Sequence, residues 1–97
     1  MDVHYVLDDI RFVWDSQKTQ TNRARHGVSF EEAAEAFFDP FLCLVDATDQ
    51  GEGRDAIIAM DERWRVLFVV HIQIEDDLLR IISARRAGPN ERKYYES

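Results

Sequence analysis

Residues suited to hold an anion gather near the carboxyl end of the chain. Between positions 80 and 93 there are five basic residues and one acid, so this segment carries +4 in a chain whose net charge is −7. The basic residues are Arg80, Arg85, Arg86, Arg92 and Lys93, and the acid is Glu91. Arginine donates paired hydrogen bonds to phosphate oxygens and stays charged. The segment therefore predicts a site for a phosphate backbone.

A second cationic group lies in the first third of the chain. Lys18, Asn22 and Arg25 follow i, i+4, i+7 spacing, so they share one face of the helix predicted there, and His26 lies beside them. This face is a candidate for holding an anionic substrate across a sheet. His26 also precedes a glycine at a predicted tight corner, so its alternative role is to cap or pack that corner.

Length and composition predict one small domain over residues 1–97, and the order of predicted helices and strands makes it an α+β domain. The charge of −7 disfavours indiscriminate binding to nucleic acids, and the excess acid either keeps the chain soluble or faces a basic partner. Cys43 is the single cysteine, which excludes an intrachain disulfide and a cysteine-based zinc site and suits a reducing cytoplasm. The apolar runs are too short to span a bilayer, so we expect a cytoplasmic protein without a membrane role.

Two helices are predicted in the first 40 residues, after a strand at 10–14 and an irregular arm before it. Asp15 is a good N-cap for a helix to about Arg25, and Gly27 lies where a left-handed residue would close it. Ser29 and Glu32 form a capping box for the second helix, which Asp39 and Pro40 end. Only a short corner joins the two helices.

The rest of the chain reads as an antiparallel meander and a short C-terminal helix. Strands are predicted at 41–46, 54–60, 64–74 and 78–84, and the helix from about Pro89. In the longest strand the face with Trp64, Val66, Phe68, Val70, Ile72 and Ile74 is predicted to be core. The alternate face, which carries Leu67, Val69 and His71, is predicted to be partly open to a ligand or partner.

Several sequence blocks closely resemble the BrnT family of bacterial type II toxins, over nearly everything from Phe12 to Glu96. The most specific are His-Gly-Val-Ser-Phe-Glu-Glu-Ala, starting at His26, and Arg-Ile-Ile-Ser-Ala-Arg, starting at Arg80. The resemblance implies a RelE-like fold and an endoribonuclease that inhibits translation without a metal or other cofactor. It also implies neutralisation by a BrnA-like antitoxin in a 2:2 complex, with operator DNA bound only through the antitoxin.

Metal-free RNA cleavage uses the substrate's 2′-hydroxyl as nucleophile, so it needs a base, cations near the phosphorus and an acid. Arg65 and Arg85 are the candidate phosphate clamps, Glu91 is the candidate base, and His71 is a further candidate because its ring takes a proton near pH 7. Each has a structural alternative: ion pairs for the arginines, a favourable charge at a helix start for Glu91, and a hydrogen-bonded place on an apolar strand for His71.

The candidate RNA-binding residues come from both cationic groups and the last helix. They are Lys18, Arg25, His26, Arg80, Arg86, Arg92 and Tyr95. Tyr94 and Tyr95 could stack on bases, but adjacent tyrosines on a terminal helix more often divide between packing and solvent.

Residues 71–77 depart from the family pattern. Many members carry a polar Thr-x-Arg-like segment there, whereas this chain has Ile72 and Ile74 followed by three acids. The departure supports an alternative function, a catalytically weak or inactive relative that binds an antitoxin and supports operator repression. A third alternative is an α+β domain with an unrelated role, which the density of family motifs disfavours.

Overall fold

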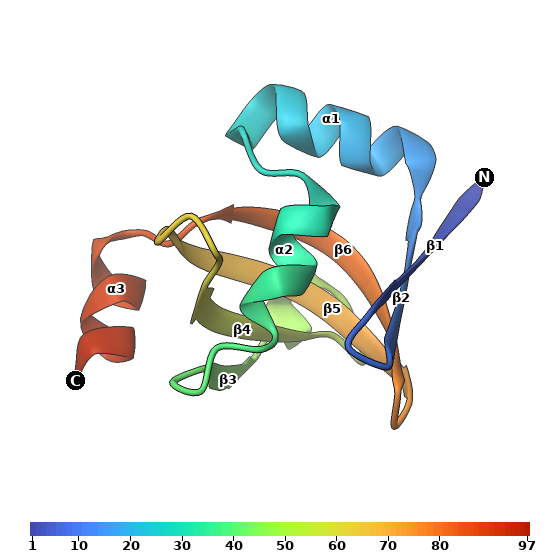
Figure 1. Cartoon of the computed structure of the whole chain (residues 1–97). Helices are drawn as coiled ribbons and strands as arrows, with labels where there is room; N and C mark the ends of the chain where they lie inside the picture. Colours follow the sequence, from blue (N-terminus) through green and yellow to red (C-terminus); the bar gives the residue numbers. More distant parts are fainter.

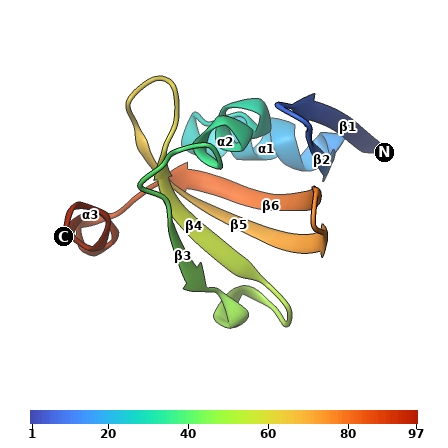
Figure 2. The same ribbon diagram turned by 60° about the horizontal axis from the view of Figure 1, so that its bottom comes forward.

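A six-stranded sheet in the order β1-β2-β6-β5-β4-β3 forms the centre of the protein (Figure 1). In the computed structural model, which describes residues 1–97, the strands are β1 (Asp2–Leu7), β2 (Ile10–Asp15), β3 (Cys43–Asp46), β4 (Asp55–Met60), β5 (Val66–Glu75) and β6 (Leu78–Arg86). The helices are α1 (Ser16–His26), α2 (Phe30–Ala36) and α3 (Pro89–Glu96), with a short 3-10 turn at Thr48–Gln50. Figure 2 shows α1 and α2 on one side of the sheet and α3 beyond its end.

The amino-terminal segment is a strand, so the prediction of an irregular arm is wrong. β1 pairs antiparallel with β2 along its whole length. The connecting residues Asp8 and Asp9 have φ values of 48° and 68°, and a two-residue type I′ turn requires positive φ at both positions. Val3, Tyr5 and Leu7 pack against the core. Their alternation with exposed residues was the signal for this strand.

The sheet is mixed, which corrects the prediction of a purely antiparallel one. β2 runs parallel to β6, with Arg11 opposite Leu78 and Val13 opposite Arg80, and the other neighbours are antiparallel. Short turns indicate antiparallel neighbours, but β2 and β6 are far apart in the chain and pair across two helices and three strands. No local sequence pattern predicts the pairing of β2 with β6.

Both N-terminal helices start as predicted, because their caps are local. The Asp15 carboxylate accepts hydrogen bonds from the amides of Gln17 and Lys18, and Gly27, at φ 72°, closes α1 by donating its N–H to the Arg23 carbonyl. The capping box of Ser29 and Glu32 is formed. The regular part of α2 ends at Ala36, before the predicted Asp39, because the next amides bond three residues back and tighten the last turn.

The main core lies between the sheet and its two helices, and it contains the face of β5 that was predicted to be open. Leu67 and Val69 are fully buried there, together with Phe12, Trp14 and Phe30. The other face carries Phe68 and Val70, of which Val70 packs with Ala47 and Ala56 in a smaller cluster. The middle of β5 is apolar on both faces, so alternation alone could not tell which face the helices cover. No helix is long and apolar enough to cross a membrane.

Candidate functional site

A hollow of about 450 Å³ lies between α1 and the edge of β6. Lys18, Arg25 and His26 line its helical side, and Ile82 and Ser83 line its sheet side. Lys18 and Arg25 have no carboxylate partner, since every ion pair of the protein involves other groups. The structure therefore brings the predicted α1 cations together at an accessible concave surface, and it adds the β6 edge to them.

Asn22 holds α1 against this edge. Its Nδ2 donates to the carbonyls of Val28, at 3.0 Å, and Ala84, at 2.6 Å, while its Oδ1 accepts from the Ala84 amide at 3.0 Å. β2 pairs with β6 only as far as Arg80, so the buried Asn22 amide takes the place of a neighbouring strand at Ala84. The sequence placed Asn22 on the cationic face, but nothing local distinguished it from the exposed polar residues around it.

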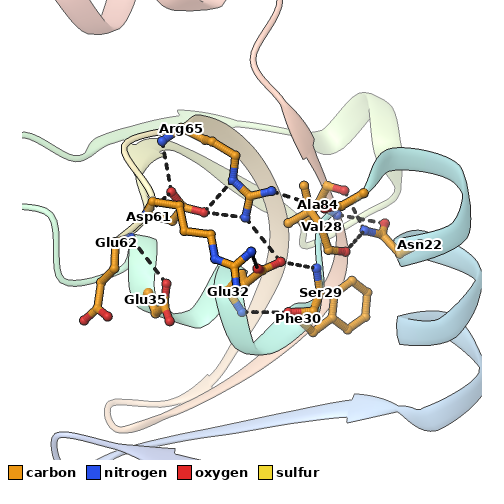
Figure 3. A network of polar contacts seen from close by, with 12 residues as sticks. Asn22, Val28, Ser29, Phe30, Glu32, Glu35, Asp61, Glu62, Arg65 and Ala84 are labelled. Atoms are coloured by element: carbon orange, nitrogen blue, oxygen red, sulfur yellow. Dashed lines mark hydrogen bonds and ion pairs between the residues drawn. The ribbon is translucent and has the colours of Figure 1, made fainter.

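Arg65 lies at the centre of a polar network that ties the turn before β5 to the helices (Figure 3). Its guanidinium donates to Asp61 Oδ2 from Nε at 2.9 Å and from Nη2 at 2.6 Å, and Nη1 donates to the Gly27 carbonyl at 3.2 Å. Nη2 also lies 3.2 Å from Glu32 Oε1. The Arg65 side chain is 13% exposed and that of Asp61 0%. These contacts favour the structural alternative for Arg65 over the predicted phosphate clamp.

The same network sets the protonation of Glu32. Burial would raise the pKa of its carboxyl, but hydrogen bonds from Ser29 and Arg65 outweigh burial and hold the pKa below its usual value. Glu32 is therefore ionised at neutral pH, and it serves both the α2 cap and the Arg65 network.

Arg85 and Glu91 form a bidentate pair at the junction of β6 and α3. Arg85 Nη1 lies 2.7 Å from Glu91 Oε1, and Nη2 lies 2.8 Å from Oε2. Glu91 also accepts the amide of Gly88 at 2.8 Å, which satisfies a free N–H at the start of α3. The side chains are 42% and 25% exposed, and the guanidinium carbon lies 4.5 Å from the centre of the Phe68 ring. The two candidates are brought together, and Arg85 holds the pKa of Glu91 below its usual range.

His71 lies apart from these cations, under α2. It is 3% exposed, and its ring meets that of Phe37 edge-on with centroids 5.0 Å apart. Its Nδ1 has no hydrogen-bond partner, and burial lowers its pKa. Because the helix-covered face is closed to a substrate, this placement argues against the predicted catalytic role. It corrects the assumption that this face of β5 is open.

The remaining candidates differ in availability. Arg80 pairs with Asp2 of β1 at 2.7 Å. The Tyr95 hydroxyl donates to Asp39, and burial together with this carboxylate raises the pKa of Tyr95 to about 12. Tyr95 thus takes the packing alternative. Arg86 has no ion pair, and Arg92 lies 3.7 Å from Glu96. No group of three or more His, Cys, Asp or Glu residues could hold a metal ion.

A family model and a solved structure both relate the chain to the BrnT toxins. The family model described as "Ribonuclease toxin, BrnT, of type II toxin-antitoxin system" matches residues 14–91. The crystal structure of the Brucella abortus ribonuclease toxin BrnT is similar, with a TM-score of 0.62 and 23% sequence identity. This similarity covers 77% of this chain and 92% of that chain, and it shows a shared fold. A comparison with curated protein sequences found no match.

Proposed function

The chain belongs to the BrnT family of ribonuclease toxins of type II toxin-antitoxin systems, and on this premise we propose that it cleaves RNA in the cytoplasm and thereby inhibits translation. The observation that carries the proposal is the distribution of cations that no carboxylate neutralises. In a chain of net charge −7, Lys18 and Arg25 line the α1–β6 hollow, and Arg86 and Lys93 lie at the β6–α3 junction. Such local positive surface suits a phosphate backbone.

In the proposed reaction, Arg85 contacts the scissile phosphate and Glu91 is the base. Glu91 takes the proton of the 2′-hydroxyl, and the 2′-oxygen bonds to phosphorus. The bond between phosphorus and the 5′-oxygen breaks, and the leaving 5′-oxygen takes a proton from water. Glu91 is ionised at neutral pH because its pKa lies below its usual value, as a base requires. A phosphate that draws the Arg85 guanidinium away would raise this pKa and strengthen the base.

Substrate binding is assigned to the groups that keep free hydrogen-bond donors. Lys18, Arg25 and His26 would hold the backbone in the hollow, with Arg86 and Arg92 as further phosphate contacts. Arg80 and Tyr95 are engaged within the fold and would contribute less. Arg65 and His71 keep the structural roles that their contacts support.

The test is expression of the chain alone in bacteria, with growth and intact cellular RNA as readouts. Wild type should stop growth and fragment RNA, and Arg85→Ala should relieve both while its circular dichroism stays that of the folded protein. Arg11→Ala is the matched control, because Arg11 is an exposed arginine paired with Glu75 and Asp77. Normal growth with soluble, folded wild-type protein and intact RNA would sink the proposal.

A second candidate function is that of a catalytically weak relative that binds a BrnA-like antitoxin and supports operator repression. The neutralisation of Arg85 by Glu91 favours it, because a paired guanidinium has less charge to offer a phosphate. Here the free chain leaves RNA intact, forms a 2:2 complex with the antitoxin by light scattering, and shifts operator DNA only within that complex. RNA loss with wild type that Arg85→Ala prevents would exclude this function.

A further inference from the structure

Trp64 is exposed in a way that the fold does not require. It lies in the turn between β4 and β5 and is 83% exposed, although the sequence pattern predicted a core residue. Its φ is 67°, a conformation that bulky side chains rarely adopt and glycine adopts freely. Strain of this kind persists where the surroundings enforce it and is concentrated at functional sites. A side chain that buries so little of its surface cannot offset that strain by packing.

The turn that carries Trp64 is rigid. The Trp64 amide donates to the Asp61 carbonyl at 3.2 Å, and the Asp61 amide donates to the Arg65 carbonyl at 3.0 Å. The Asp61 carboxylate also accepts the amides of Arg63 and Arg65, both at 3.0 Å. These bonds fix the backbone on both sides of Trp64, so the indole projects from a constrained position.

Arginine side chains lie next to this indole. Trp64 lines a hollow of about 130 Å³ together with Arg65, Arg86 and Arg92. A neighbouring hollow of about 380 Å³ shares Ala87 and Arg92 with it and adds Lys93, with Glu96 as its one acid. Arg86 and Lys93 have no ion pair, whereas Arg65 is paired with Asp61 and Glu32, and Arg92 lies 3.7 Å from Glu96. An exposed aromatic ring beside accessible cations is the arrangement with which proteins hold single-stranded nucleic acid: bases stack on the ring and cations hold phosphates.

The turn is also fixed relative to the proposed catalytic pair. Arg65, which follows Trp64, donates to the Gly27 carbonyl at the end of α1. The Ala87 amide donates to the Val66 carbonyl at 2.9 Å, just beyond Arg85. A base stacked on Trp64 would therefore place the attached phosphates between the end of α1 and the β6–α3 junction.

We propose that Trp64 is a stacking platform for an unpaired RNA base and that Arg86 and Arg92 hold the phosphates next to that base. This inference rests on the proposed function, because it assigns a subsite to the same RNA. An unpaired, unstacked base is specified because the faces of a base inside a duplex are covered by the neighbouring base pairs and are not free to stack on the indole. Arg86 and Arg92, which line the hollow beside the indole, disfavour a basic protein segment as the occupant.

The test is a fluorescence titration with a single-stranded 2′-O-methyl oligonucleotide, which lacks the nucleophile and stays intact. Trp14 is 1% exposed, so the long-wavelength emission of the protein comes from Trp64. Stacking should quench this emission and leave that of Trp14. Trp64→Ala should weaken binding about tenfold or more, as loss of one stacked base does, and Trp64→Phe should keep most of the affinity. Phe41→Ala is the control, since Phe41 is 73% exposed on the chain entering β3.

The outcomes separate this inference from the proposed function. If the wild type does not bind the oligonucleotide, both fail. If it binds and Trp64→Ala binds equally well, RNA binding stands and the stacking platform is refuted. The same holds if Trp64→Ala weakens only antitoxin binding. An oligonucleotide of the same length without bases should bind wild type and Trp64→Ala alike, and a difference there would contradict stacking.

Stability gives an independent readout. Trp64→Gly removes the strained φ, so its midpoint of urea unfolding should equal or exceed that of wild type while affinity for the oligonucleotide falls as in Trp64→Ala. A tryptophan retained for the fold would show the opposite pattern, with a lower midpoint and unchanged affinity.

Discussion

Asn22→Ala should destabilise the protein far more than a substitution on a polar helix normally does. Asn22 is 7% exposed and makes three hydrogen bonds with the backbone of Val28 and Ala84. Alanine leaves two carbonyls and one amide without their partner. A buried group left in this way costs about 1–3 kcal/mol, and the adjoining hollow allows water to reach part of the gap, so the lower figure applies.

The expected loss is therefore about 3 kcal/mol, of the roughly 5–15 kcal/mol by which domains of this size are stable. At about 4–8 °C for each kcal/mol, the midpoint of thermal unfolding should fall by about 12–24 °C. Asn22→Asp should cost more at pH 7, because a carboxylate oxygen would then face the carbonyls of Val28 and Ala84.

Acidification should partly rescue Asn22→Asp. Burial beside carbonyl oxygens raises the pKa of an aspartate above its unfolded value of about 3.9. A raised folded pKa gives a contribution to stability that is complete below the unfolded pKa and is lost as pH rises through the folded one. Urea unfolding at pH 4 and pH 7, followed by circular dichroism, measures both effects. Gln20→Ala, on an exposed position of the same helix, is the control. A loss below about 1 kcal/mol for Asn22→Ala would refute the strand-like role of Asn22.

Three further predictions concern the ion pairs and α3. Arg65→Ala should lower the free energy of unfolding in urea by about 3 kcal/mol, because it leaves the fully buried Asp61 carboxylate without its cation. The control Arg63→Ala removes an exposed partner of Glu32 and should change the free energy of unfolding little. Equal losses for the two variants would contradict the network. Tyr95→Phe should flatten the decline of stability between pH 10 and about 12, because the folded pKa of Tyr95 is raised to about 12 and its contribution is lost as pH rises through that value; an unchanged slope would speak against its bond to Asp39. Glu91→Gln should be less stable than wild type at pH 7 but equally stable in strong acid. The pKa of Glu91 is lowered in the folded protein, so its contribution to stability is present above the unfolded pKa and is lost as pH falls through the folded pKa. A difference in stability that does not change with pH would rule out the ion pair as the source of that difference.

The features that the sequence predicted are those that neighbouring residues determine. The Asp15 cap, the left-handed Gly27 and the capping box of Ser29 and Glu32 each depend on atoms within about four positions, and all are formed. The family assignment is also confirmed, because its motif blocks are contiguous in the chain. For these features, residue type and spacing along the chain were sufficient for a correct prediction.

The errors arose where a residue's role depends on a distant partner. β2 pairs in parallel with β6, which lies at the other end of the chain. His71 is buried because it lies on the face of the sheet that the helices cover. Arg65 and Arg85 look alike in the sequence. In the structure Arg65 is nearly buried between Asp61 and Glu32, whereas Arg85 pairs with Glu91 and stays partly exposed. Among nineteen acids, the sequence offered no means to choose those partners.

The acidic turn at Glu75–Asp77 is part of the net charge of −7 but contributes little to the electrostatic potential at the turn that carries Trp64. The acidic turn at Glu75–Asp77 and the turn that carries Trp64 lie at opposite ends of β5, whose ten residues span about 30 Å. At physiological ionic strength, interactions between exposed charges are screened over about 8 Å. The charges of this acidic turn therefore interact only weakly with an anion bound at Trp64 and Arg86. Lowering the salt concentration lengthens the distance over which the acids act. The association rate of the oligonucleotide should therefore rise less at low salt than it would if only the nearby cations acted on it. Replacing Glu75 and Asp76 with Gln and Asn should restore that acceleration at low salt and leave the rate at 0.15 M unchanged.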